Sequence, residues 1–155
     1  AALDVLGQFL PRGSLFIYRE TPQGIREELR VREDLERLDL GDMPMVVLVN
    51  GGTEGEAEAV AAVLQESGRA VLMGTGTSGK GASYKFMELS NGSAIYLPTL
   101  RWFTPEGKAL GRSGVEPNFP VAFQPNSGGI GGESQFNLAY DYLNDLLPPF
   151  RERGL

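Results

Sequence analysis

The sequence predicts a mixed α/β domain, and three patterns along the chain support this class. Residues 45–50, MVVLVN, and residues 69–73, RAVLM, are short apolar runs of strand length. Apolar residues recur at helical spacing between them. A strand, a helix and a strand in this order predict a parallel βαβ unit with a right-handed crossover. Alternating segments on both sides of Asn91-Gly92 predict an additional β-hairpin.

The elements that precede the βαβ unit are a helix and a hairpin. Apolar residues at helical spacing predict an amphipathic helix over residues 2–10, which Pro11 ends. Residues 14–20 and 25–31 have strand-like patterns and flank Thr-Pro-Gln-Gly at 21–24, which predicts a hairpin turn.

Within the βαβ unit, the continuous apolar run at 45–50 predicts a strand that is buried on both faces. The helix is expected to start near Glu54 and to stop at Ser67-Gly68. Its apolar stripe is formed by Ala57, Val60, Ala61 and Leu64.

The last third of the chain continues with strands, turns and a helix. Trp102 and Phe103 lie at the end of the second hairpin strand, where packing in the strand core is the favoured interpretation. Residues 105–107, Pro-Glu-Gly, predict a turn, and residues 126–132 predict a loop. A final helical face is expected from Phe136, Ala139, Tyr140, Leu143 and Leu147.

Composition narrows the possible chemistry. The chain has 155 residues, which corresponds to one domain, and contains neither cysteine nor histidine. Histidine-based triads, imidazole bases and cysteine or histidine metal sites are therefore impossible within it. The net charge of −6 argues against a nucleic-acid partner. No apolar run approaches the roughly 20 residues that span a bilayer.

The glycine-rich segment GTGTSGKG at 74–81 has the spacing of a phosphate-binding loop. Such a loop also needs a Ser or Thr after the lysine and a helix after that. Here residue 81 is Gly, and the following residues read as a strand. The pattern therefore favours a glycine-rich turn between strands with a solvated Lys80.

A second interpretation gives Lys80 a chemical role. A buried lysine that shares its site with a nucleophile can act as a general base, because desolvation lowers its pKa. The helix that follows residues 45–50 could offer a nucleophile at its N-terminus, where backbone N–H groups can stabilise an oxyanion. Serine–lysine dyads use this logic.

Several separated motifs make the chain similar to the tail-specific, or carboxyl-terminal processing, serine peptidases. The block from 43 to 118 carries the resemblance. Its matching positions are Asn50, Gly52, Glu58, the Gly-Arg-Ala-Val at 68–71, the Gly-Lys-Gly at 79–81, Thr104-Pro105, Gly107 and the Gly-Val-Glu-Pro at 114–117.

This resemblance implies a crotonase-like α/β core in which residues 1–155 form a single domain. It implies that the core is N-terminally incomplete, because an upstream strand, an Asn-Pro-Gly-Gly oxyanion segment and a PDZ domain precede this region in the family. The missing strand would leave an unpaired edge beside residues 45–50, so we expect self-association.

The resemblance also assigns three site positions. Lys80 stands at the general-base position, Gly55 stands at the nucleophile position without a side chain, and Tyr84 stands where a Gln or Glu orients the base. Covalent catalysis at Gly55 is impossible. Thr53, Ser78 and Ser83 carry hydroxyls near these positions but are disfavoured as substitute nucleophiles, because Thr53 lies two residues before the nucleophile position and neither serine stands at a helix N-terminus.

The acidic residues of this region have a structural interpretation. Glu54, Glu56 and Glu58 could suggest paired acids or a cation site, but first-turn acids that complement the helix dipole are favoured.

The resulting prediction is a serine peptidase homologue without peptidase activity. The alternative is a non-catalytic module that binds peptides or apolar ligands, or a scaffold on the same fold. No cofactor or metal is implied. The expected partners are unfolded or C-terminal polypeptide segments, and the resemblance, with the lack of cysteine, implies an extracytoplasmic location.

Overall fold

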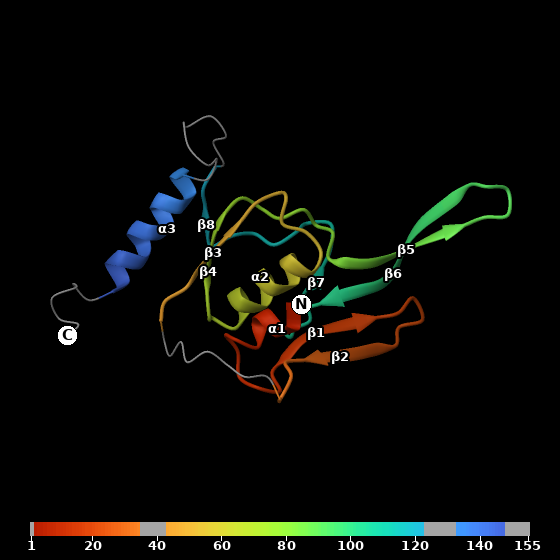
Figure 1. The fold of residues 1–155 in the computed structure, drawn as a ribbon, viewed down its shortest axis with the longest axis horizontal. Coiled ribbons are helices and arrows are strands. Elements are labelled where there is room, and N and C mark those ends of the chain that lie inside the picture. The colour runs from red at the N-terminus through yellow and green to blue at the C-terminus, as the bar shows by residue number, and fades with distance from the viewer. Residues whose placement is uncertain (1, 35–42, 123–132, 148–155) are drawn as a thin grey trace.

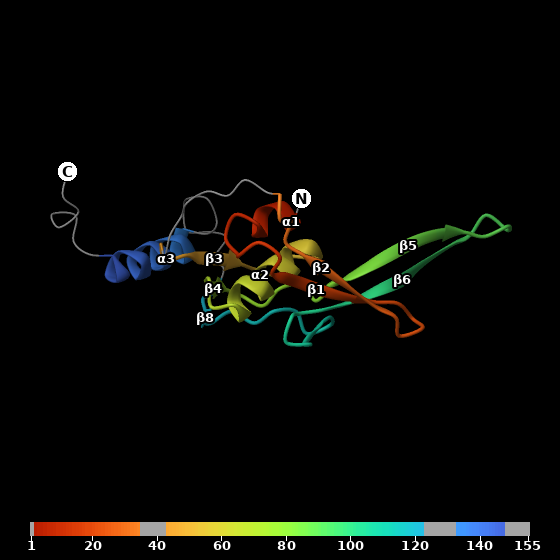
Figure 2. The same cartoon turned by 90° about the horizontal axis from the view of Figure 1, so that it is seen from below.

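The computed structural model describes residues 2–34, 43–122 and 133–147. In these ranges the chain forms two β-sheets and three helices (Figure 1). The helix α2 (Glu56–Glu66) lies near the centre, and α1 (Ala2–Leu6) packs against it. The helix α3 (Glu133–Leu146) lies at the end of the molecule opposite the β-hairpins, as Figures 1 and 2 both show.

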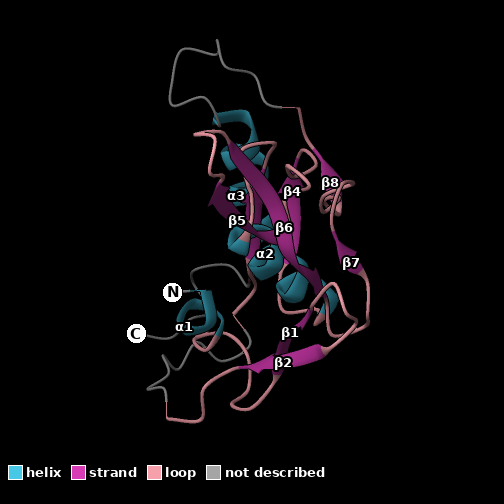
Figure 3. Cartoon of the chain, turned by 90° about the vertical axis from the view of Figure 1, so that its right-hand side faces the viewer, coloured by secondary structure: helices cyan, strands magenta, loops and turns pink. Residues whose placement is uncertain are grey.

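The larger sheet is antiparallel and contains both predicted hairpins. Its strand order is β2-β1-β6-β5, and the short β7 pairs with β6. The strands are β1 (Leu15–Glu20), β2 (Arg26–Arg30), β5 (Ala82–Glu88), β6 (Ala94–Phe103) and β7 (Ala109–Leu110). Viewed from the hairpin end, α2 lies behind β6 (Figure 3).

The smaller sheet confirms the predicted βαβ unit. It contains β3 (Val46–Val49), β4 (Val71–Gly74) and β8 (Phe119–Pro120) in the order β3-β4-β8, and all pairs are parallel. The two-residue strand β8 was not predicted, because it is too short to carry a periodic pattern.

The core lies where α2 meets both sheets. The helix contacts β1 on one side and β4 on the other. Its buried apolar residues are mostly small, which allows close approach of the helix to the strands; they are Ala59, Ala61, Ala62, Val63 and Leu64. In the described ranges, no helix is both long and apolar enough to cross a bilayer.

The predicted turns are confirmed. In the first hairpin the Thr21 N–H donates to the Ile25 carbonyl at 2.9 Å. In the second, Gly92 has a φ of 81°, the left-handed conformation that an Asn-Gly turn provides. In the turn at residues 105–107, the Gly107 N–H donates to the Thr104 carbonyl at 2.8 Å. The loop expected at 126–132 falls outside the described residues.

Two expectations for the early elements are wrong. The first helix ends at Leu6, short of residue 10, although Leu10 is still buried at 4% exposure. The strand β3 is not buried on both faces, since Leu48 is 40% exposed. The reason is that β3 lies at the edge of the smaller sheet, where α3 covers only part of it.

The expected face of the last helix is also partly wrong. Phe136 and Tyr140 are exposed, and the buried positions are Gln135 and Ala139. The helix packs along β3 and β4, and Tyr142 contacts Phe119 of β8, so only part of its apolar stripe is covered in the described part of the chain. The Gln135 side chain is anchored there, because its Nε2 donates to the Val121 carbonyl at 2.8 Å.

Candidate functional site

The first part of the candidate site is the turn that joins β3 to α2. The Asn50 carbonyl accepts the Thr53 N–H at 2.8 Å, and the Asn50 side chain accepts the Gly52 N–H at 2.8 Å. The Thr53 hydroxyl accepts the Asn50 N–H at 3.2 Å. These three bonds within four residues fix the path of the chain into α2.

This turn leads to Gly55, which is the N-cap residue of α2. Its φ of 60° and ψ of −125° form a sharp strand-to-helix turn, a conformation that L-residues rarely adopt. Strained turns of this kind present the nucleophile of α/β-hydrolases. A Cβ atom added at Gly55 would have no other atom within 4 Å. The position is therefore open, and glycine leaves it without a reactive group.

The second part of the site is the loop between β4 and β5, which is fixed by the buried carboxylate of Glu58. This side chain is 1% exposed. Its two oxygens accept the N–H groups of Gly79 at 2.7 Å, Lys80 at 2.8 Å and Gly55 at 3.2 Å, and the hydroxyls of Thr77 and Ser78.

Interpreting Glu58 as a first-turn acid that complements the helix dipole is therefore incomplete. The carboxylate joins the start of α2 to the glycine-rich loop, so both parts of the site share one anchor. A signal for this role exists in the sequence. Glu58 is the third residue of the helix, and the glycine-rich loop offers a series of backbone donors.

Close packing explains the glycines of the loop. A Cβ at Gly79 would lie 2.6 Å from the Arg112 carbonyl oxygen, and one at Gly81 would lie 2.6 Å from the Leu110 Cβ. The loop leads directly into β5 and not into a helix. The segment 74–81 is thus the structural turn that the sequence favoured over a phosphate-binding loop.

Lys80 reaches from this loop to the residue before Gly55. Its Nζ lies 2.6 Å from a Glu54 carboxylate oxygen, and the two side chains are 63% and 55% exposed. The hydrogen bond and the charge of Glu54 raise the pKa of the Lys80 ammonium above its ordinary value. The lysine side chain is thus exposed and paired with a carboxylate, whereas a lysine that acts as a general base is usually buried, where desolvation lowers its pKa.

Tyr84 lies on β5, beyond the loop. Its ring stacks on that of Tyr96 at 5.0 Å between centroids, with planes 12° apart. The ring is 42% exposed. The stacking gives Tyr84 a position on the hairpin surface.

The hydroxyls near the site have structural partners. The Ser78 hydroxyl donates to Glu58 at 3.3 Å, and the Ser83 hydroxyl accepts the Trp102 indole N–H at 3.1 Å. The Ser78 N–H also donates to the Thr53 carbonyl at 3.0 Å, so the two walls of the site are joined at this point. Trp102 is buried at 8% exposure, as the strand-core interpretation predicted.

Comparison with known proteins identifies the class. The model of peptidase family S41 matches residues 1–121. A carboxyl-terminal-processing protease of Synechocystis is 31% identical over 147 residues, which cover 95% of this chain and 33% of that protein. The carboxy-terminal processing protease CtpA of Bacillus subtilis is 31% identical over 75% of this chain and 24% of that protein.

Solved structures agree with this result. The photosystem II D1 C-terminal processing protease superposes with a TM-score of 0.60 at 28% identity, over 78% of this chain and 30% of that one. A putative S41 protease of Bacteroides fragilis has a TM-score of 0.70 at 18% identity, over 95% and 41% of the two chains, which supports the fold alone.

The chain therefore belongs to peptidase family S41, the family of the carboxyl-terminal processing proteases. It spans about a third of the Synechocystis relative and about a quarter of the Bacillus relative. The mixed α/β fold class predicted from the sequence is confirmed, and it corresponds to part of the core of these peptidases.

Proposed function

We propose that this chain is a carboxyl-terminal processing peptidase homologue that does not cleave peptide bonds through an acyl-enzyme. The observation that carries the proposal is the open N-cap position at residue 55. Its backbone has the geometry of a strained nucleophile turn, but glycine supplies no oxygen or sulfur to attack a carbonyl.

The environment of Lys80 supports the same conclusion. A lysine that is 63% exposed and bonded to Glu54 keeps its proton at neutral pH and cannot accept one from a nucleophile. The polar group that would orient a base is replaced by Tyr84, whose ring packs on Tyr96.

The test is the hydrolysis of an unstructured polypeptide with an apolar C-terminus. The wild-type chain and Lys80→Ala should both leave it intact over hours, as followed by mass spectrometry. Cleavage by the wild type that Lys80→Ala abolishes would contradict the proposal and would indicate Thr53 or Ser78 as a displaced nucleophile.

The alternative function is a module that binds extended polypeptide. The observation that favours it is the outer strand β5, which lies at one end of the larger sheet. Phe86 is 61% exposed and Met87 is 47% exposed, so the edge offers backbone groups beside apolar side chains, as strand addition requires. Phe86→Asp should weaken binding of a labelled unfolded peptide in fluorescence anisotropy, whereas Lys85→Gln should not.

Two further properties are proposed with this function. The edge strand β3, with Leu48 40% exposed, supports self-association, and a monomer in sedimentation at high concentration would contradict it.

The absence of cysteine supports an extracytoplasmic location, which secretion of a reporter fusion to the full gene product would test.

A further inference from the structure

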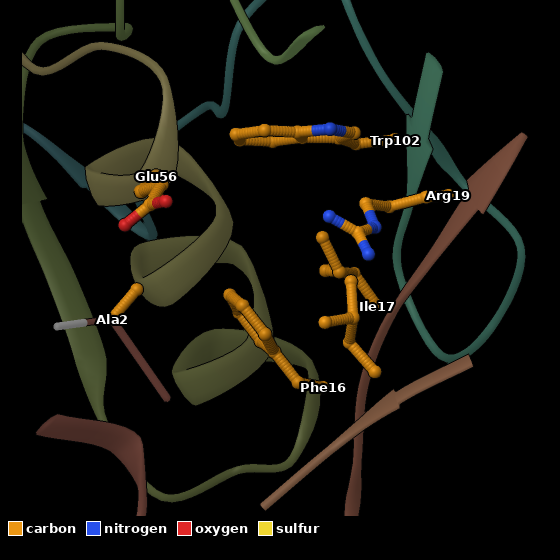
Figure 4. Close-up of a pocket in the computed structure, with 7 residues that line it drawn as sticks. Ala2, Phe16, Ile17, Arg19, Glu56 and Trp102 are labelled. Atoms are coloured by element: carbon orange, nitrogen blue, oxygen red, sulfur yellow. The ribbon is translucent and has the colours of Figure 1, made fainter. Parts of the chain in front are cut away.

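A small cavity lies between α2 and the larger sheet, next to the candidate site. Its volume is about 100 Å³. Ala2, Phe16, Ile17 and Leu29 supply apolar walls, and Arg19, Glu56 and Trp102 supply the remaining surface (Figure 4). Glu56 is exposed and directly follows Gly55, so the cavity opens to solvent beside the nucleophile position.

Arg19 is the cationic member of this lining. It stands on β1 opposite Trp102 of β6 and Glu27 of β2, so the three side chains share one face of the sheet. The Arg19 Nη2 donates to a Glu27 carboxylate oxygen at 2.8 Å. Its Nε is buried and has no hydrogen-bond partner among the described residues.

A guanidinium carries five N–H donors, and a buried donor without an acceptor is unfavourable. An acceptor that enters the cavity would relieve this cost. Because the donor group is charged and planar, the acceptor that fits it best is a carboxylate, whose two oxygens match the guanidinium edge.

Glu56 does not fill this role. It lies across the cavity from Arg19 in Figure 4, and no ion pair joins the two side chains in the described part of the chain. The indole N–H of Trp102 is already bonded to Ser83, so the tryptophan offers the cavity its apolar ring. The cavity therefore combines the Arg19 guanidinium, whose Nε–H lacks an acceptor among the described residues, with apolar walls and the carboxylate of Glu56 at its opening.

We propose that this cavity binds a carboxylate on a short apolar stem, with the Arg19 guanidinium as its partner. The volume is well below the roughly 300 Å³ at which sites for drug-sized ligands begin, so it suits one side chain or one chain terminus. The carboxylate can come from the C-terminus of a polypeptide or from an acidic side chain.

The site deepens the proposed function, because its ligand would be part of a polypeptide held beside residue 55, and to that extent it rests on that function. The carboxylate site and the proposed lack of peptidase activity can be contradicted separately. Carboxylate binding is measured with small probes and without hydrolysis, so a chain that cleaves peptides could still bind the probes, and an inactive chain could fail to bind them.

Trp102 provides the readout, because it is the only tryptophan of the chain and lines the cavity. Three probes are titrated against the full chain by fluorescence. N-acetyl-leucine presents a terminal carboxylate, the α-amide of N-acetyl-glutamic acid presents a side-chain carboxylate, and N-acetyl-leucinamide presents none.

A saturable change with at least one carboxylate probe, and at least tenfold weaker binding of the amide, is the expected result. The tighter of the two carboxylate probes identifies the source of the ligand group. Equal binding of N-acetyl-leucine and its amide, or no response to either carboxylate at millimolar concentration, would overturn the proposal without any variant.

Variants sharpen the assignment to Arg19. Arg19→Gln should weaken carboxylate binding roughly ten- to a hundredfold, because a charged hydrogen-bond partner is lost. Glu56→Gln should strengthen it roughly two- to fivefold, because a like charge at the opening is removed. Arg101→Gln is the matched control, since this exposed arginine precedes Trp102 and points to the opposite face of β6.

Arg19→Gln could also perturb folding, so its circular dichroism spectrum and unfolding midpoint accompany the titration. If that variant unfolds, Glu56→Gln still decides the matter, because its side chain is exposed. Unchanged or weaker carboxylate binding in Glu56→Gln would contradict the proposed electrostatics, as would unchanged binding in a folded Arg19→Gln.

Discussion

The two sides of the glycine-rich loop differ sharply in how they are held. On the inner side, the loop is bonded to Glu58, a carboxylate that is 1% exposed. On the outer side, the Lys80 ammonium is bonded to Glu54, and both side chains are more than half exposed. Glu58 lies in the first turn of α2 and Glu54 directly precedes its N-cap, but only the carboxylate of Glu58 is protected from water.

This difference separates two parts of the site. The frame is the chain path held by the buried bonds to Glu58, and the chemistry is the set of side chains at residues 54, 55 and 80 that could take part in a reaction. Buried hydrogen bonds to a charged group are costly to break, because each orphaned donor loses its partner without regaining water. An exposed ion pair contributes little net stability, because water and salt screen it. The path of the chain around the site is therefore held mainly by the buried bonds to Glu58, and the exposed pair of Glu54 and Lys80 adds little to it.

The largest effect is expected where the frame is tightest. Gly74 ends β4 with a φ of 132°, and a Cβ there would lie 1.9 Å from the Val49 carbonyl oxygen. Gly74→Ala should force β3 and β4 apart and destabilise the fold by roughly 3–5 kcal/mol in urea unfolding.

Gly51→Ala is the matched control for this substitution. An added Cβ at Gly51 meets no atom within 4 Å, and the residue has no positive φ. Its unfolding free energy should stay within about 0.5 kcal/mol of the wild type. Equal effects of the two substitutions would show that the junction of β3 and β4 is not tightly packed.

The next effect in size concerns the anchor of the frame. Glu58→Gln keeps the shape of the side chain but replaces charged acceptors with one neutral acceptor and a donor that faces other donors. We expect a loss of about 3 kcal/mol and a fall of roughly 6–12 °C in the melting temperature. Glu88→Gln, at an exposed position on β5, should leave the melting temperature nearly unchanged.

The smallest effect on stability is expected on the outer side. Because Glu54 raises the pKa of Lys80, Glu54→Gln should lower that pKa, and an NMR titration of the Lys80 side chain measures the shift. The pair stabilises the fold below the unfolded pKa of lysine, and this contribution is lost as pH rises through the higher folded pKa. Near neutral pH the Lys80 ammonium therefore keeps its proton. An unchanged or higher Lys80 pKa in the variant would contradict the pairing.

The same division explains what could be predicted from the sequence. The βαβ unit, both hairpins and the strand after the glycine-rich loop follow from local patterns, and the structure contains all of them. The partial burial of β3 and the exposed Phe136 could not be predicted in this way. Both depend on which elements cover each face of the strand or helix. Periodicity in the sequence indicates that an apolar stripe exists, but it does not indicate which element packs against it.

For the site, the spacing of the glycine-rich segment drew attention to Lys80, and the family resemblance assigned Gly55 to the nucleophile position. The structure brings Lys80 into contact with Glu54, the neighbour of Gly55. The bond between Lys80 and Glu54 was not predicted, because it joins residues 26 positions apart. The roles of Glu58 and Arg19 were missed for a related reason. Each depends on burial and on long-range partners: the helix position of Glu58 and the donors of the glycine-rich loop are visible in the sequence, but their contact is not, and Arg19 carries no such signal.

The most direct measurement compares the peptidase activity of Gly55→Ser with that of Gly55→Ser/Glu54→Gln on one unstructured substrate. If the frame is intact and only the chemistry is missing, Gly55→Ser alone should show little activity, because Lys80 stays protonated. At alkaline pH, adding Glu54→Gln should raise the activity measurably, because a lower Lys80 pKa enlarges the neutral fraction of the amine, and adding Lys80→Ala should abolish it. Full activity of Gly55→Ser that Glu54→Gln does not change, or no Lys80-dependent cleavage by the double variant although it is folded, would contradict the separation of frame and chemistry.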